Sequence, residues 1–155
     1  MGSGKTTVGR IVADALGCPF LDLDEVVAKS EKCSIAVIFA TKGEEYFRRA
    51  EEKALADVLK RYAQGDLVLA LGGGAILSAS SRALLQSGSL CIWLDAPAEL
   101  LWSRVSRSSR PLANADFTAR LESRRPLYAE AAHITIDTDG LSPQDIADEI
   151  IISCL

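Results

Sequence analysis

The chain opens with the stretch that decides its fold, Met1-Gly2-Ser3-Gly4-Lys5-Thr6-Thr7. The pattern Gly-x-x-x-x-Gly-Lys-Ser/Thr forms a phosphate-binding loop where a strand passes into a helix. Gly4, Lys5 and Thr6 supply the second half of that pattern, and its leading glycine would lie two residues before Met1. We therefore expect a phosphate loop followed by a helix, in a chain truncated on its N-terminal side by one strand.

The residues of this loop suit a nucleoside triphosphate. Backbone N–H groups around Gly2 and Gly4 can point at phosphates, and the following helix adds the positive end of its dipole. Lys5 can reach the β- and γ-phosphates, while the Thr6 hydroxyl can bind Mg²⁺. The predicted nucleotide-binding residues of the loop are Gly2, Ser3, Gly4, Lys5, Thr6 and Thr7.

Hydrophobic residues after the loop recur at helical spacing. They are Val8, Ile11, Val12 and Leu16, and Gly17 follows them as a stop signal. A loop that runs directly into an amphipathic helix is the context that a phosphate-binding loop requires. This context favours the loop over a chance Gly/Ser-rich tail.

Length and composition indicate one globular domain, residues 1–155, with 48% hydrophobic and 25% charged residues. The net charge of −4 argues against a nucleic-acid partner, and no apolar run is long enough to cross a bilayer. The four cysteines contain no Cys-x-x-Cys pair and are distant in sequence from His133. We expect reduced thiols and no zinc site, with Cys91 buried in a strand.

Strand and helix patterns alternate along the chain. Continuous apolar runs at 67–71 and 90–94 are typical of strands buried on both faces of a parallel sheet. Further strands are predicted at 19–23 and 134–136; helices at 24–29, 35–41, 44–63, 80–87, 98–107, 117–124, 127–132 and 143–154; and a polar loop at 108–115. The predicted fold is α/β, a parallel sheet with helices on both faces in a three-layer sandwich. Ligands bind at the carboxyl ends of the strands in such folds.

Polar and glycine-rich residues follow two of these strands. Asp22 and Asp24 end the strand at 19–23, where alternation would place both on one side. One carboxylate could hold Mg²⁺ and the other could accept a proton, or Asp24 could simply cap the next helix. Gly72, Gly73 and Gly74 follow the strand at 67–71, and suit a place where backbone lies against a ligand.

Three arginines are candidates for binding anions. Arg48 shares a helix face with Glu51, Arg110 lies in the polar loop, and Arg124 precedes the helix break at Pro126. Arginine is suited to bidentate capture of carboxylates and phosphates. For the segments of Arg48 and Arg110 taken alone, an ordinary charged surface is the favoured interpretation, and for Arg124 the alternative is a charge at a helix end.

These segments, in this order, resemble the shikimate kinase family, in the nucleoside-monophosphate-kinase-like branch of P-loop proteins. The residues that carry the resemblance are 1–9, Asp22-Leu23-Asp24, 43–48 with Glu51, the triple glycine, Arg110-Pro111-Leu112, and Arg124 with Pro126-Leu127-Tyr128. The chain departs from the family pattern at the absent first glycine and the strand before it. In this family that strand is central, between the strands ending at Leu71 and Leu94, so both would keep an unpaired edge.

The resemblance implies transfer of the ATP γ-phosphoryl group to the 3-hydroxyl of shikimate, a step of chorismate and aromatic amino-acid biosynthesis. It implies that Lys5 and the loop hold phosphates, and that Thr6 and Asp22 hold Mg²⁺. Asp24 would bind shikimate hydroxyls and act as base. Arg48 and Arg124 would bind the shikimate carboxylate, and Gly72, Gly73 and Gly74 would lie against its ring. Arg110 would bind the phosphates from a lid at about 107–116, and Arg104 and Pro143 would contact adenine.

Two alternatives stay open at this point. Another small-molecule kinase of this fold, such as gluconate kinase, would share the phosphate loop, and a catalytically silent kinase-like binding module would keep the fold without turnover. The resemblance also implies a monomer without nucleic-acid or membrane partners. It is compatible with the cytoplasm, or with a plastid if an upstream targeting segment was lost.

Overall fold

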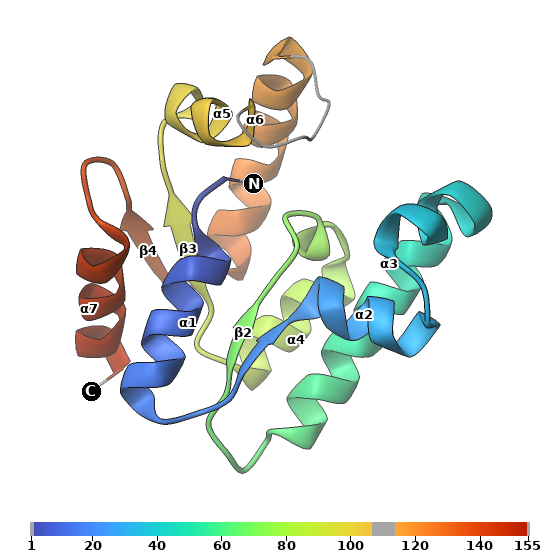
Figure 1. Cartoon of the computed structure of the whole chain (residues 1–155), viewed down its shortest axis with the longest axis horizontal. Helices are drawn as coiled ribbons and strands as arrows, with labels where there is room; N and C mark the ends of the chain where they lie inside the picture. Colours follow the sequence, from blue (N-terminus) through green and yellow to red (C-terminus); the bar gives the residue numbers. More distant parts are fainter. Residues whose placement is uncertain (1, 107–113, 155) are drawn as a thin grey trace.

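Helices and strands alternate in the structure, a computed structural model that describes residues 2–106 and 114–154 (Figure 1). The strands are β1 (Phe20–Asp22), β2 (Val68–Ala70), β3 (Ile92–Asp95) and β4 (Ile134–Asp137). The helices are α1 (Lys5–Leu16), α2 (Leu23–Glu31), α3 (Ile35–Arg61), α4 (Ala79–Gly88), α5 (Ala98–Ser106), α6 (Asn114–Ala131) and α7 (Pro143–Cys154), with a 3₁₀ turn, η1 (Ala75–Leu77). This order confirms the predicted α/β class.

The parallel sheet is split into two halves. β1 pairs with β2 and β3 pairs with β4, both in parallel. In the part of the chain that the structure describes, no strand pairs with the second edge of β2 or of β3. A cavity of about 650 Å³ lies between these two edges, and its lining includes Val8, Val12, Leu69, Ala70, Ile92 and Leu94. The sequence predicted an unpaired edge on each of these two strands, because the strand that would lie between them is not part of the sequence.

Helices cover both faces of the strands, which gives three layers. Successive residues of β2 point to opposite faces of the sheet. Val68 packs with residues of α1 and α7 on one face, and Leu69 packs with residues of α2, α3 and α4 on the other. Ile92 and Leu94 of β3 join the α1–α7 side. A third cluster fills the space between α5 and α6.

The strands beside the cavity are less buried than the sequence predicted. Leu69, Ile92 and Trp93 are only half-buried, although apolar runs of this kind indicate burial on both faces. Cys91 is also half-buried and lies just before β3, so its predicted burial within a strand is wrong. The open cavity at the edges of β2 and β3 explains these differences, because a strand with a bare edge exposes its backbone and the adjoining side chains.

The predicted helix ends are correct at two glycines and wrong at one proline. Gly17 ends α1 with a φ of 65°, and Gly43, with φ 82° and ψ 172°, separates the two helical pieces that the structure joins as α3. In contrast, α6 continues through Pro126, where an interruption was predicted. The side chains of Arg124 and Tyr128, one on each side of the proline, both bond to the Gly73 carbonyl and hold the helix in place.

The cysteines, all among the described residues, form no disulfide bond, and the helices were compared with the length and hydrophobicity of a membrane span. Cys18, Cys33, Cys91 and Cys154 are all free thiols. Of the helices in residues 2–106 and 114–154, none is both long and apolar enough to cross a membrane.

Candidate active site

The loop before α1 adopts the backbone conformation of an anion site. Gly2 and Gly4 have φ values of 75° and 84°, a left-handed region that side chains disfavour. Gly4 caps α1 without a side-chain acceptor, so the N–H groups of the first helical turn can face an anion. The Lys5 ammonium donates to the Ser3 hydroxyl at 3.3 Å, and Thr7 lies exposed in the first turn. Ser3 and Lys5 thus lie together at the start of the helix, and their role in binding phosphates stays a prediction.

The loop packs against α5 on its other side. A Cβ on Gly2 would lie 2.8 Å from the Leu101 carbonyl oxygen, so no side chain fits there. Arg104 donates from Nη1 to the Gly2 carbonyl at 3.4 Å, and Pro143 is exposed at the start of α7. The adenine-binding role of Arg104 and Pro143 stays a prediction. Arg110 lies outside the described residues, as does the lid from 107 to 113, while residues 114–116 belong to α6.

Asp22 and Thr6 place two side-chain oxygen atoms close together beside the loop. The Thr6 hydroxyl donates to Asp22 Oδ2 at 3.3 Å, and the other carboxylate oxygen accepts the backbone N–H of Asp24 at 3.0 Å. Asp22, and not Asp24, is therefore the cap of α2. A hydroxyl and a carboxylate suit Mg²⁺, which keeps waters and binds substrate phosphates in such sites. No group of three or more His, Cys, Asp or Glu side chains is placed to hold a metal within the described residues.

Asp24 lies in the first turn of α2 and not in the strand, so strand alternation does not govern its direction. A Cβ on Gly72 would lie 3.0 Å from Asp24 Oδ1 and 3.1 Å from Glu51 Oε1. Gly72 therefore leaves room for two carboxylates that approach each other at the end of β2. Burial raises the pKa of Glu51, the Arg48 hydrogen bond opposes that rise, and the charge of Asp24 adds to it.

Arg48 completes this group from α3. Its Nη1 donates to Glu51 Oε2 at 2.7 Å, its Nη2 donates to Glu44 Oε1 at 3.3 Å, and its guanidinium lies 5.1 Å from the centre of the Phe47 ring. Glu51 is 3% exposed. Arg48 Nε and Glu51 Oε1 are the buried side-chain polar atoms that lack a hydrogen-bond partner among the described residues. Buried polar groups are nearly always paired, so this pair of unpaired atoms indicates a place for a polar ligand.

Arg124 reaches the same glycine turn from α6. Its Nη1 donates to the Gly73 carbonyl at 3.1 Å, and the Tyr128 hydroxyl donates to the same oxygen at 2.7 Å. The structure thus brings Arg48 and Arg124 to the triple glycine from two different helices, as the sequence predicted. Two cations beside a carboxylate and a glycine-lined turn can orient a small hydroxylated anion.

The Arg48 guanidinium occupies the space that a side chain at Gly74 would need. A Cβ on Gly74 would overlap Arg48 Nη1 and Nη2. We expect Gly74→Ala to displace the guanidinium and weaken binding of shikimate, the anion that the family resemblance implies, by about tenfold, because a small displacement of an orienting group weakens its bond to the ligand. Isothermal titration calorimetry would measure this affinity. Gly65→Ala is the matched control, since a Cβ there meets nothing within 4 Å; equal losses in both variants would contradict the steric account.

Sequence reasoning missed two sets of contacts at this site. Tyr128 carried no predicted role, although it lies four residues after Arg124 and so shares its helix face. The ion pair between Arg125 and Asp95 was also missed. Asp95 ends β3 on the carboxyl side, which is the signal that could have indicated it.

Comparisons with known proteins identify the family. The family model described as shikimate kinase matches residues 1–155. The chain belongs to the shikimate kinase family. A shikimate kinase of Symbiobacterium thermophilum is 46% identical over 97% of this chain and 90% of its own length, and one of Nostoc punctiforme is 44% identical over 97% and 84%. Among solved structures, a shikimate kinase from Acinetobacter baumannii in complex with shikimate is 38% identical, with a TM-score of 0.91 over 99% of this chain and 88% of that chain.

Membership of the shikimate kinase family confirms the predicted P-loop kinase fold. It also favours a kinase that acts on shikimate over a gluconate kinase and over a catalytically silent binding module.

Proposed function

We propose that this chain transfers the γ-phosphoryl group of ATP to the 3-hydroxyl of shikimate, which yields shikimate 3-phosphate for aromatic amino-acid biosynthesis. The observation that supports this proposal most strongly is the set of charged side chains around the triple glycine. Arg48 and Arg124 supply two cations, Asp24 supplies a carboxylate, and Arg48 Nε and Glu51 Oε1 are buried without partners. Shikimate has one carboxylate and several hydroxyls, so it matches this set of charges and hydrogen-bonding atoms.

The nucleotide is held by the loop and the start of α1. Lys5 and the backbone N–H groups from Gly2 to Thr7 bind the phosphates, and we assign Arg110, which lies outside the described residues, to the same phosphates. The oxygens of Thr6 and Asp22, which lie 3.3 Å apart, hold Mg²⁺, directly or through water. When bound, Mg²⁺ neutralises charge on the phosphates. The proposed adenine contacts are Arg104 and Pro143.

The acceptor is oriented at three points. Arg48 and Arg124 bind its carboxylate, Gly72 to Gly74 lie against its ring, and Asp24 accepts a hydrogen bond from the hydroxyl that attacks. Asp24 takes the proton of that hydroxyl during transfer. Glu51 holds Arg48 in place through its 2.7 Å bond to Nη1.

The cavity between β2 and β3 belongs to this proposal. It is lined by apolar side chains of both strand edges, and α1 begins at the carboxyl ends of the strands (Figure 1). A strand that leads into Gly2 from the other end of the sheet would run parallel to β2 and β3 and fill this space. We propose that such a strand completes the sheet and fixes the phosphate loop.

An extended form of the chain tests this part of the proposal. We expect a melting temperature higher by roughly 10 °C, and faster turnover, when about six apolar β-branched residues and Gly-x precede Met1. The gain comes from strand pairing and from burial of the cavity walls. Calorimetry of this form would be compared with one whose extension has the same length but carries lysine and proline. Equal melting temperatures for the two extended forms would contradict a strand in the cavity.

A coupled assay tests the function itself. ADP release would be followed with shikimate and with gluconate as acceptors, on the chain and on its strand-extended form. Shikimate-dependent release supports the proposal, while release with gluconate alone would reject it. We further propose a monomer that acts in the cytoplasm, which size-exclusion chromatography and localisation of a tagged protein would check.

A further inference from the structure

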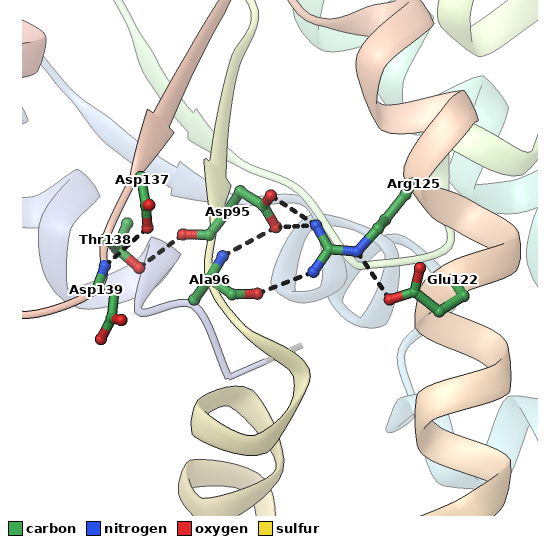
Figure 2. Close-up of polar contacts among 7 residues, drawn as sticks. All are labelled: Asp95, Ala96, Glu122, Arg125, Asp137, Thr138 and Asp139. Atoms are coloured by element: carbon green, nitrogen blue, oxygen red, sulfur yellow. Dashed lines mark hydrogen bonds and ion pairs between the residues drawn. The ribbon is translucent and has the colours of Figure 1, made fainter.

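Arg125 follows Arg124 on α6 but reaches the end of β3 (Figure 2). Its Nη1 donates to both carboxylate oxygens of Asp95 at 2.6 Å, and its Nη2 donates to the Ala96 carbonyl at 3.0 Å. Its Nε donates to Glu122 on the same helix at 3.0 Å. All three nitrogens of the guanidinium are bonded, so the side chain is held in a single orientation.

Asp95 is itself a fixed anchor. Its backbone carbonyl accepts hydrogen bonds from the N–H and the hydroxyl of Thr138, both at 2.9 Å, and Thr138 is fully buried (Figure 2). Asp95 Oδ1 also accepts the backbone N–H of Ala96 at 2.9 Å. The carboxylate that binds Arg125 is therefore attached firmly to the β3–β4 half of the sheet.

α6 is also attached to the other half of the molecule. Arg124 and Tyr128 both donate to the Gly73 carbonyl, which follows β2. On the β3–β4 side, the Tyr128 ring stacks on Trp93 of β3 with 5.6 Å between centroids. α6 thus spans the gap between the two half-sheets. The position of Arg124 relative to the glycine turn depends on where the Arg125 anchor holds the helix.

We propose that Arg125, through its ion pair with Asp95, is a positioning residue for the shikimate site and acts through Arg124. This inference rests on the proposed function. The side chains of Arg125 and Asp95 are each only 25% exposed, so removal of one partner also lowers stability, and the melting temperature of each variant separates that loss from an effect on the site. Placement of the neighbouring guanidinium, in contrast, directly affects an anion that must be held at a defined distance.

The test measures two affinities in the same proteins. Isothermal titration calorimetry would give the dissociation constants of shikimate and of ADP for the unaltered chain, Arg125→Gln and Arg125→Lys, with a melting temperature for each. We expect Arg125→Gln to weaken shikimate binding about tenfold while ADP binding changes less than about twofold. Arg125→Lys should recover part of the loss, because it restores the charge opposite Asp95. Arg120→Gln, an exposed arginine on the same helix, is the control and should leave both affinities unchanged.

A second variant removes the other partner of the ion pair. Asp95→Asn should weaken shikimate binding as Arg125→Gln does, and the double variant should be no weaker than either single one. Unchanged shikimate affinity in both single variants would overturn the proposal, and so would an equal fall in shikimate and ADP affinity with a lower melting temperature. An unaltered chain that binds ADP and not shikimate would instead overturn the substrate site, and this role of Arg125 with it.

Discussion

Asp24→Asn is expected to lower the turnover number by about 10²- to 10⁴-fold while nucleotide affinity is retained. The amide keeps the size of the side chain and its place beside Gly72 and Glu51. It cannot accept the proton that leaves the shikimate hydroxyl, so the loss falls on the chemical step. Steady-state kinetics with shikimate, together with a calorimetric ADP titration, would separate these effects.

The control for this variant lies on the same helix. Glu25→Gln removes the neighbouring carboxylate of α2, which is exposed, and should leave turnover unchanged. Turnover of Asp24→Asn within a few-fold of the unaltered protein would refute the role of Asp24 as base.

Arg48→Ala should raise the KM for shikimate by roughly a hundredfold, since it removes one of two cations for the carboxylate and leaves Glu51 buried without its partner. The unpaired Glu51 also makes the loss of stability depend on pH. Burial already raises the pKa of Glu51 above its ordinary value, and without Arg48 that pKa rises further. Such a group destabilises the folded state progressively as pH rises above its ordinary pKa, and most strongly once pH exceeds the raised pKa of the folded state. The melting temperature of the variant should therefore fall more at pH 8 than at pH 5.

Arg49→Ala is the matched control for this effect. Arg49 is the next residue on α3, is largely exposed, and pairs with Glu45 at 2.6 Å on the surface. Surface pairs of this kind contribute little, so shikimate kinetics should not change. A KM for shikimate that is the same in Arg48→Ala and Arg49→Ala would remove Arg48 from the site.

The local sequence was enough to place the strands and most helices along the chain to within a few residues, apart from the break predicted at Pro126. Gly17 and Gly43 end helical segments because their positive φ values suit glycine, a preference that the sequence carries directly. The continuity of α6 through Pro126 was not predictable in this way. It depends on Arg124, Arg125 and Tyr128, whose partners Gly73 and Asp95 are distant along the chain.

The same distinction applies to the site. Most candidate residues belonged to short motifs, and the structure brings Asp24, Arg48 and Arg124 to the triple glycine, while their roles stay predictions. The unpaired Glu51 oxygen and the steric role of Gly74 could not be predicted, because both arise from packing between α3 and the turn after β2. The half-burial of Leu69 and Ile92 likewise follows from the unpaired strand edges and not from their own hydrophobicity.

The position of the transferred phosphate tests the central claim most directly. The chain, alone and with its strand extension, would be incubated with ATP, Mg²⁺ and shikimate, and the product would be examined by phosphorus–proton correlation NMR. We expect a phosphate coupled to the proton on carbon 3 of shikimate, formed in step with ADP. ADP without phosphorylated shikimate, or phosphate on another hydroxyl, would contradict the proposed geometry of Asp24, Arg48 and Arg124.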